Sequence, residues 1–588
     1  MADQFLSGIP TSPGIAIGRA FLVDRRRLKT PKRHISDEDV GVELARLDAA
    51  IAISDEQLER VKRKLREREG EDHFRILEAH QLILHDEHMV APTRQRIREE
   101  RINAEWALRK TVEEIKSLFS AIGEDYFRER RSDVDFVGDR ILRNLMGEND
   151  DAVGPVPPDA IVISHDLSPS DTAQLHRASC AAFVTDAGGK TSHSAILARA
   201  FQIPAVAGVD RASEVIANGD LVIVDGFHGA VLLAPTLDEI EKYRALARKH
   251  TQFTAAVLQN RSAPAITNDG MRVHLYANVE VTEEIPTALD RGAEGIGLYR
   301  TEFLYLERTD FPREEEHFMH ARGILRRVAP FPVTFRTLDL GGDKMGPLKP
   351  FQEANPALGL RSIRLCLKEP ALFKTQLRGL LRASLHGRMR IMFPMISGLA
   401  ELRAAREILE QAKDELRRES LPFDEKLPIG IMVEMPSAAI TADLLARECD
   451  FLSIGTNDLI QYSLAIDRVN EHVGYLYHPL HPSILRFVRY VCDAGRAAGI
   501  RVGMCGEMAG EPMFAQVLLG LGLEELSMNP ISLPVVKSVI RGSTRAEAER
   551  LTGEVMSLST AADVERCVEE WMLARFPEDL LRAAGDAR

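Results

Sequence analysis

The sequence predicts a multidomain α/β protein: a discontinuous α/β domain interrupted by an all-α domain of helical hairpins, then a linker helix and a C-terminal (β/α)8 barrel. Three observations predict this organisation. At 588 residues the chain is too long for one core, so two to four domains are expected. A charge-rich segment with helical periodicity separates two strand-rich segments. The last part, of about 300 residues, alternates strand and helix, which is typical of a barrel.

The first domain is assigned to residues 1–34 and 148–234. Its opening stretch, GIPTSPGIAIGRAFLV, indicates short strands broken by proline and glycine turns. Strand-like runs return after residue 160 as AIVIS, AAFVT, LVIVDG and AVLLAP. The segment between, residues 35–147, carries apolar residues at helical spacing, as in FRILEAHQLILHDEHM, and predicts about four helices. It is therefore expected to be an insertion into the α/β domain.

Residues 235–262 are expected to form a linker helix, residues 263–575 the barrel and residues 576–588 a tail. Seven barrel strands are predicted, at VHLYANVE, GIGLY, VTFRTLD, IMFPMI, IGIMVEM, FLSIGTN and VGMCGE. Most of them end in polar residues of catalytic type. A barrel of this kind carries its chemistry at the carboxyl ends of its strands, so these ends are the expected site.

Composition excludes several classes of function. With 75 basic and 88 acidic residues the net charge is −13, which disfavours non-specific nucleic-acid binding. The six cysteines contain no CxxC pair, which argues against a zinc ribbon and a disulfide framework and fits a reducing cytosol. No signal peptide and no apolar run of roughly 20 residues is evident. A cytoplasmic protein without membrane insertion is expected.

The stretch TDAGGKTSHSAILAR places His193 at the start of a predicted helix, just after a glycine turn. A nucleotide-binding P-loop would need a glycine at position 184, which is Val184. The backbone N–H groups of such a turn, with Lys190, can hold an oxyanion, so His193 could accept a phosphoryl group. Alternatively, Thr191 or Ser192 caps the helix and His193 is an ordinary surface residue. A metal site is disfavoured because no second His or Cys lies three or four residues away.

Four arginines near the predicted strand ends could converge on a phosphate and a carboxylate, which the guanidinium fork matches: Arg300, Arg336, Arg361 and Arg364. The alternative for each alone is a salt bridge at the barrel rim.

Glu434 and Asp458 follow adjacent predicted strands and suit a Mg2+ ion, although a helix cap or an ion pair would explain either alone. Cys505 is a candidate proton donor or a small buried apolar residue. His478 and His481 lie in YHPLHPS, where the prolines indicate a loop rather than a metal site.

Eleven motifs in order resemble Enzyme I of the bacterial phosphotransferase system, the phosphoenolpyruvate–protein phosphotransferase family. The motifs are SPGIAIG, DLSPSDTAQL, TDAGGKTSHSAILAR, GIGLYRTEFLYL, FRTLDLGGDK, NPALGLRSIRL, MFPMIS, MVEMPSA, FLSIGTNDLIQYSLAIDR, HPSIL and GMCGEMAG. The similarity runs from about residue 8 to about residue 575. The resemblance implies a swivelling phosphohistidine domain, a helical domain that binds the carrier protein HPr, and a phosphoenolpyruvate-binding barrel that forms a homodimer. The implied activity is transfer of the phosphoryl group of phosphoenolpyruvate to the enzyme, with release of pyruvate, and then to HPr for sugar transport.

The resemblance also implies residue roles. His193 matches the phosphoryl acceptor and Thr172 the residue that orients it. The matched substrate contacts are Arg300, Arg336, Asn457, Asp458 and Arg468. Glu434 and Asp458 match ligands of Mg2+, for which Mn2+ is expected to substitute, and Cys505 matches the acid that protonates the enolate of pyruvate. The departures are Lys190, where many members have arginine, and Ser168, where they have threonine.

Two alternatives differ in class. Pyruvate phosphate dikinase and phosphoenolpyruvate synthase share the histidine domain and the barrel but carry a large ATP-binding domain ahead of the histidine, whereas only 192 residues precede His193 here. A non-catalytic regulator with the same fold is the other, and the joint presence of His193, Arg300, Glu434, Asp458 and Cys505 argues against it. Because the expected nucleophile and the expected donor site lie in different domains, we expect a swivelling linker with hinges near Pro235 and Pro264.

Overall fold

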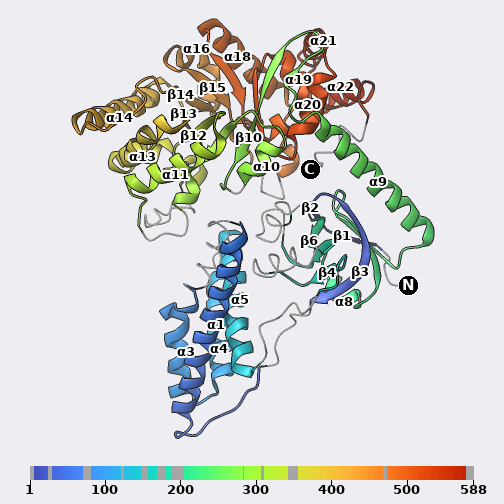
Figure 1. Ribbon diagram of the computed structural model, residues 1–588, viewed down its shortest axis with the longest axis vertical. Helices are drawn as coiled ribbons and strands as arrows, with labels where there is room; N and C mark the ends of the chain where they lie inside the picture. The colour runs from blue at the N-terminus through green and yellow to red at the C-terminus, as the bar shows by residue number, and fades with distance from the viewer. Residues whose placement is uncertain are drawn as a thin grey trace. The chain divides into compact units, whose positions relative to one another are not determined.

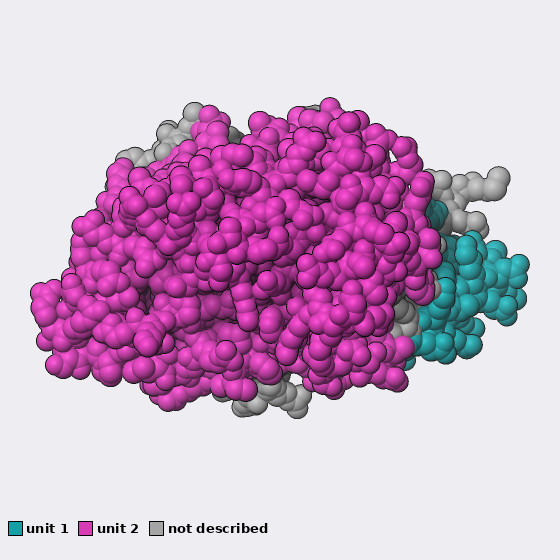
Figure 2. Space-filling view, turned by 90° about the horizontal axis from the view of Figure 1, so that it is seen from above, with its two compact units in different colours: residues 1–252 teal, residues 253–588 magenta. Residues whose placement is uncertain are grey.

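The computed structural model describes most of the chain. The chain divides between residues 252 and 253 into two compact units (Figure 2). The described residues are 5–23, 30–69, 81, 83–120, 125–147, 156–167, 180–188, 198, 203–282, 284–305, 310–341, 355–467 and 473–577. Each unit is described by itself. No helix among these residues is long and apolar enough to cross a membrane.

The first unit contains an eight-stranded mixed sheet in the order β1-β8-β7-β3-β4-β5-β6-β2. Its strands are β1 (Phe5–Ser7), β2 (Ile9–Ser12), β3 (Ile15–Val23), β4 (Ile161–Ser164), β5 (Ala182–Thr185), β6 (Ala205–Ala207), β7 (Leu221–Asp225) and β8 (Ala230–Leu233). The short helix α8 (Ala212–Val215) lies between β6 and β7. β4 and β5 are buried throughout, as expected for apolar strands in the middle of a sheet. β6, in the short run PAVAG, was not predicted.

The discontinuous α/β domain predicted from the sequence is confirmed by the pairing of β3 with β4. These strands lie about 140 residues apart in the chain, yet they run side by side in parallel, with Ala20 opposite Ile161 and Val23 opposite Ser164. The helical segment between them is therefore an insertion into one continuous sheet.

The inserted segment is helical, as predicted (Figure 1). Its described helices are α1 (Val40–Glu69), α3 (Glu87–Glu99), α4 (Ala104–Ser120) and α5 (Asp125–Met146). Their apolar faces share one core that includes Leu58, Ile97 and Leu142. Half of the stretch FRILEAHQLILHDEHM, residues 74–80 and 82, lies outside the described residues.

A long helix, α9 (Leu237–Gln259), occupies the segment predicted to be a linker and contains the division between the two units. Its start is set by a reciprocal cap, in which Thr236 N donates to Glu239 Oε2 at 2.8 Å and Glu239 N donates to Thr236 Oγ1 at 3.3 Å.

The second unit is a closed barrel of eight parallel strands, as predicted (Figure 1). The strands are β10 (Arg272–Val279), β11 (Ile296–Arg300), β12 (Pro332–Arg336), β13 (Arg388–Phe393), β14 (Ile429–Val433), β15 (Phe451–Ile454), β16 (Arg501–Met504) and β17 (Glu525–Met528). β10 pairs with both β17 and β11 and so closes the barrel, while a short β9 (Ala265–Ile266) pairs antiparallel with β10.

Helices follow the strands on the outside of the barrel. They are α10 (Glu284–Asp290), α11 (Glu314–Val328), α12 (Ile363–Lys368), α13 (Pro370–Ala383), α14 (Leu399–Arg418), α15 (Pro436–Ile440), α16 (Ala442–Leu445), α17 (Thr456–Leu464), α18 (Pro482–Ala498), α19 (Ala515–Leu521), α20 (Leu533–Arg541), α21 (Arg545–Val555) and α22 (Ala561–Leu573). One apolar core joins these helices to the strands.

The prediction missed one barrel strand, β17. Its sequence, ELSM, contains the buried polar residues Glu525 and Ser527, so no apolar run marks it. Glu525 is accommodated because Arg390 donates to it at 2.9 Å inside the barrel.

Candidate active site

Six of the predicted barrel residues that the structure describes lie at the carboxyl ends of the strands. Each follows directly from a strand: Arg300 ends β11, Arg336 ends β12, Glu434 follows β14, Asn457 and Asp458 open α17 after β15, and Cys505 follows β16. Parallel strands of a closed barrel bring these ends to one face, which we call the barrel mouth.

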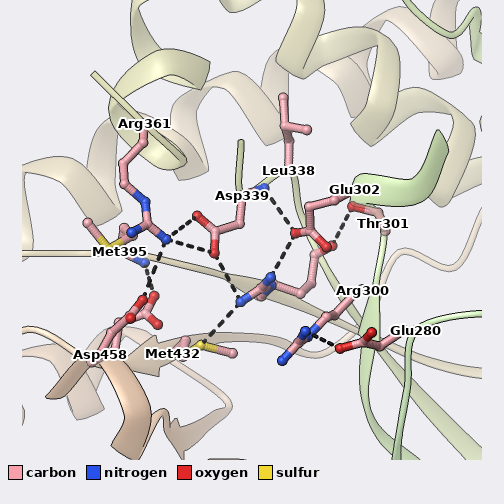
Figure 3. Close-up of polar contacts among 12 residues, drawn as sticks. Glu280, Arg300, Thr301, Glu302, Leu338, Asp339, Arg361, Met395, Met432 and Asp458 are labelled. Atoms are coloured by element: carbon pink, nitrogen blue, oxygen red, sulfur yellow. Dashed lines mark hydrogen bonds and ion pairs between the residues drawn. The ribbon is translucent and has the colours of Figure 1, made fainter. Parts of the chain in front are cut away.

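Arg336 is the centre of an ion-pair network at the barrel mouth. Figure 3 labels the carboxylates of this network, Glu302 and Asp339. Arg336 Nη2 donates to Glu302 Oε1 at 2.8 Å and its Nη1 lies 3.0 Å from Asp339 Oδ2. All three side chains are buried. Burial alone would lower the pKa of Arg336, but Glu302, Asp339 and Glu434 raise it, so the guanidinium stays charged.

Asp339 joins Arg336 to a second arginine, Arg361. Arg361 Nη2 contacts both oxygens of Asp339, at 3.1 and 3.3 Å, and lies 3.5 Å from Asp458 Oδ2. Burial would raise the pKa of Asp339, yet the two arginines hold it below its usual range. One ionised carboxylate therefore sets the spacing of two guanidinium groups, an arrangement suited to binding a phosphate.

Arg300 is separate from this pair of arginines. Its Nη1 forms an ion pair with Glu280, the residue that follows β10 (Figure 3). Both side chains are half-exposed. Arg300 nevertheless lies near the network, because its charge lowers the pKa of Glu302 against the larger effect of burial.

Glu434 is a buried carboxyl group whose ionised form is disfavoured by its surroundings. Its Oε1 accepts a hydrogen bond of 2.6 Å from the backbone N–H of Met395. Burial, with repulsion from Asp458 and Asp339, raises the pKa of Glu434 to about 8. A divalent cation would relieve this repulsion, and carboxylate oxygens are the ligands that Mg2+ prefers, so Glu434 and Asp458 fit such an ion. Across the described part of the chain, however, no group of three or more His, Cys, Asp or Glu side chains is arranged to hold a metal.

Cys505 lies in the barrel with its thiol protonated. Its Sγ lies 3.8 Å from the carbonyl oxygen of Ile454, and burial raises the pKa of the thiol to about 11. The backbone after it is held because Asn278 Nδ2 donates to Cys505 O at 2.9 Å. All six cysteines are free. A protonated thiol at the mouth can donate a proton but is a poor nucleophile at neutral pH.

Asn457 is held by one rim residue, Glu507. Asn457 Nδ2 donates to Glu507 Oε1 and Glu507 N donates to Asn457 Oδ1, both at 2.9 Å. This reciprocal pair fixes the amide between the ends of β15 and β16.

Three predicted site residues, His193, Thr172 and Arg468, lie outside the described residues, as do the departures Lys190 and Ser168. The segment that leads toward His193 is described as far as Gly188. There Asp186 Oδ1 accepts from Ser213 N at 3.0 Å, and Thr185 Oγ1 donates to Ala187 O at 2.8 Å. β5 therefore ends in a turn whose backbone is fixed by side chains.

The contacts of Arg364 and of the two histidines of YHPLHPS resolve two further interpretations of the sequence. Arg364 does not join Arg361, because it donates to the carbonyls of Leu358 and Gly359, at 3.0 and 3.2 Å. His481 caps α18 by accepting from Ser483 N, and His478 lies 3.0 Å from Glu565.

The sequence analysis missed the carboxylates that hold the arginines: Glu280, Glu302 and Asp339. The positions of two of these carboxylates in the sequence could have indicated their role. Glu302 lies two residues after Arg300 and Asp339 three after Arg336, each just past a strand end at the face where barrel chemistry lies.

Comparison with known proteins covers nearly the whole chain. Three families match it: "PEP-utilising enzyme, N-terminal" over residues 7–130, "PEP-utilising enzyme, mobile domain" over 156–229 and "PEP-utilising enzyme, PEP-binding domain" over 254–545, where PEP is phosphoenolpyruvate. The phosphoenolpyruvate-protein phosphotransferase of Geobacillus stearothermophilus is 44% identical over 563 residues, 96% of this chain and 97% of the relative. That of Bacillus subtilis is 42% identical over 573 residues, 96% of this chain and 99% of the relative. The solution structure of an Enzyme I protein, 34% identical, matches 42% of this chain and 99% of its own with a TM-score of 0.36.

Proposed function

This chain belongs to the Enzyme I family of phosphoenolpyruvate–protein phosphotransferases, and we propose that its His193 takes the phosphoryl group from phosphoenolpyruvate at the barrel mouth and passes it to the carrier protein HPr. The enzyme uses phosphoenolpyruvate, and its second unit matches the phosphoenolpyruvate-binding family. The proposal concerns which residues carry out the transfer.

The observation that carries the proposal is the pair of arginines bridged by Asp339. Arg336 and Arg361 are fixed by the same buried carboxylate, at 3.0 and 3.1 Å. Phosphoryl transfer depends mainly on positioning and on stabilising charge, which two preorganised guanidinium groups supply. With its thiol protonated, Cys505 suits the role of acid rather than nucleophile, so the acceptor is expected to come from the histidine domain.

The transfer balances as follows. A ring nitrogen of His193 attacks phosphorus, the P–N bond forms, and the bond between phosphorus and the enolate oxygen breaks. The electron pair of that bond passes into the enolate of pyruvate, and the Cys505 thiol gives its proton to the methylene carbon. Water then returns a proton to the Cys505 thiolate. Arg300, Arg336 and Arg361 offset the charge of the phosphoryl group, Asn457 and Arg468 are proposed to contact the substrate, and Thr172 is proposed to orient His193.

We propose Glu434 and Asp458 as the ligands of the divalent cation that the phosphoenolpyruvate-binding family implies, Mg2+ or Mn2+. Repulsion between these carboxylates supports this assignment. When bound, such an ion would neutralise charge on the substrate and polarise its oxygens.

Delivery of His193 to the barrel requires a moving linker. The end of the linker at the barrel is held firmly, since Lys537 of α20 donates to the carbonyls of Arg261 and Gly292, and Arg541 donates to Pro264 O at 2.9 Å. These contacts argue against a hinge at Pro264 and favour one before Arg261. Pro235 stays the expected hinge at the other end.

Two partners are also proposed. The inserted helices α1, α3, α4 and α5 are the expected surface for HPr, and the barrel is the expected surface for a homodimer. The HPr surface is tested by removing the inserted helices, which should abolish phosphorylation of HPr. The homodimer is tested by sedimentation of the full chain.

Labelling with radioactive phosphoenolpyruvate and Mg2+ tests the acceptor. The wild-type protein should gain an acid-labile, base-stable label, and His193→Ala should not. The matched control is His165→Ala, which removes an exposed histidine from the same domain and should keep the label. Full labelling of His193→Ala would overturn the assignment, and labelling by ATP instead would favour the dikinase and synthase group.

A further inference from the structure

We propose that Glu280 is an internal anion that competes with the phosphate of the substrate for Arg300, and so sets the affinity for phosphoenolpyruvate. The inference rests on the proposed function only in taking Arg300 as a phosphate contact. It assigns a specificity-determining role to a residue that no sequence motif marked.

The barrel register brings Glu280 and Arg300 to the same level. β10 and β11 are parallel neighbours in which Val279 lies opposite Tyr299. Glu280 directly follows Val279 and Arg300 directly follows Tyr299, so both residues lie where the two strands end at the barrel mouth. Arg300 Nη1 is paired with Glu280 Oε1, and Figure 3 shows Arg300 turned to Glu280. Arg336 instead forms ion pairs with Glu302 and Asp339.

The backbone of Glu280 is fixed, so the carboxylate is held near Arg300. Glu284, in the first turn of α10, accepts from the N–H groups of Glu280 and Val281 at 2.8 and 3.4 Å. Glu284 is itself close enough to both charges to be influenced by Glu280 and Arg300. Arg300 therefore faces Glu280, Glu284 and Glu302, of which only Glu280 forms a direct ion pair with it.

This pair differs from the other arginine pairs of the mouth. The side chains of Arg336, Glu302 and Asp339 are each at most 11% exposed, whereas Arg300 and Glu280 are 38% and 44% exposed. Water can solvate the Glu280 carboxylate once it leaves Arg300, so the Arg300–Glu280 pair is the one that an incoming phosphate can exchange at small cost. Exposed ion pairs are weak, and removing this one should strengthen binding by about two- to fivefold.

The test measures binding of phosphoenolpyruvate and of pyruvate, by calorimetry with Mg2+, to full-length protein carrying His193→Ala, which cannot turn over. Adding Glu280→Gln should lower the Kd for phosphoenolpyruvate about two- to fivefold. The Kd for pyruvate, which has no phosphate, should stay unchanged. The matched control is Glu425→Gln, which removes a similarly exposed ion pair with Arg417 just before β14, at the opposite end of the barrel, and should change neither.

Unchanged or weakened binding of phosphoenolpyruvate by Glu280→Gln, or an equal gain for pyruvate, would overturn the inference. Absence of phosphoenolpyruvate binding even with Glu280 in place would instead overturn the proposed function. In turnover with His193 intact, Glu280→Gln should lower KM for phosphoenolpyruvate and leave kcat unchanged, whereas a purely structural Glu280 would raise KM or lower kcat.

Discussion

Replacing Glu525 by leucine tests how the barrel is held together at the amino-terminal ends of its strands, opposite the barrel mouth. Glu525 is buried and accepts from Arg390 at 2.9 Å and from Arg501 at 3.3 Å. The Arg390 guanidinium lies 5.3 Å from the ring centres of Tyr276 and of Phe451, so it has little access to water. Without Glu525 this charge would remain buried with no carboxylate opposite it.

The magnitude follows from the exposure of the two arginines. The side chain of Arg390 is 15% exposed, and removing one partner of such a buried pair costs about 3–5 kcal/mol. Arg501 is 56% exposed, so its pair adds only about 0–1 kcal/mol. The free energy of unfolding of the barrel should fall by about 3–5 kcal/mol in Glu525→Leu. In Glu525→Leu with Arg390→Met most of this loss should be recovered, because no buried charge remains.

The assay is urea unfolding of the full chain in a Trp106→Phe background. The chain has two tryptophans, and Trp571 then reports on the second unit alone. A loss below about 1 kcal/mol in Glu525→Leu, or a double variant as unstable as the two single losses added together, would refute the account of the buried pair.

Three further predictions concern the mouth and the linker. At pH 9, above the pKa of about 8 of Glu434, Mg2+ should raise the Tm of the wild-type barrel but not that of Glu434→Gln. The variant should already be more stable than the wild type without metal at this pH, because the repulsion with Asp458 and Asp339 is gone; equal stabilisation of both by Mg2+ in calorimetry would remove Glu434 as a ligand. Native Cys505 should react with iodoacetamide at pH 8 about 100-fold more slowly than Cys505 in the unfolded chain, because raising the thiol pKa from 9 to about 11 reduces the thiolate fraction by that factor. Peptide mapping with Cys567 as the internal comparison measures the two rates, and equal rates at Cys505 in the native and unfolded chains would contradict the prediction. Lys537→Met should leave the Arg261 carbonyl without its donor and cost about 1–3 kcal/mol. It should also speed amide exchange at residues 260–263, and unchanged exchange there would show that Lys537 does not anchor the linker.

Much of the fold was predictable because local patterns agreed with the global arrangement. Seven of the eight barrel strands were predicted from strand-like runs, most of which end in polar residues, and those ends supplied Arg300, Arg336, Glu434 and Cys505. β17 was missed because Glu525 and Ser527 replace the apolar pattern. Partners on other strands explain how β17 tolerates them, since Arg390 of β13 donates to Glu525 and Ser527 donates to Asn278 of β10.

The pairing of the site residues was not predictable, because it depends on register and on the direction of each side chain. Arg361 and Arg364 are three residues apart and looked equivalent, yet Arg361 contacts Asp339 while Arg364 caps nearby carbonyls. The pair of Glu280 with Arg300 exists because Val279 lies opposite Tyr299, a register that no single strand reveals.

The central claim is that the donor site and the acceptor lie in different domains, and one measurement tests it most directly. A single turnover of enzyme in excess over phosphoenolpyruvate is quenched in alkali, pyruvate is assayed, and the phosphorylated residue is located by mass spectrometry. We predict one pyruvate for each phosphate, with the phosphate on His193, and no pyruvate from Arg336→Met. Pyruvate formed without phosphoprotein, or phosphate on a residue of the barrel, would contradict the account.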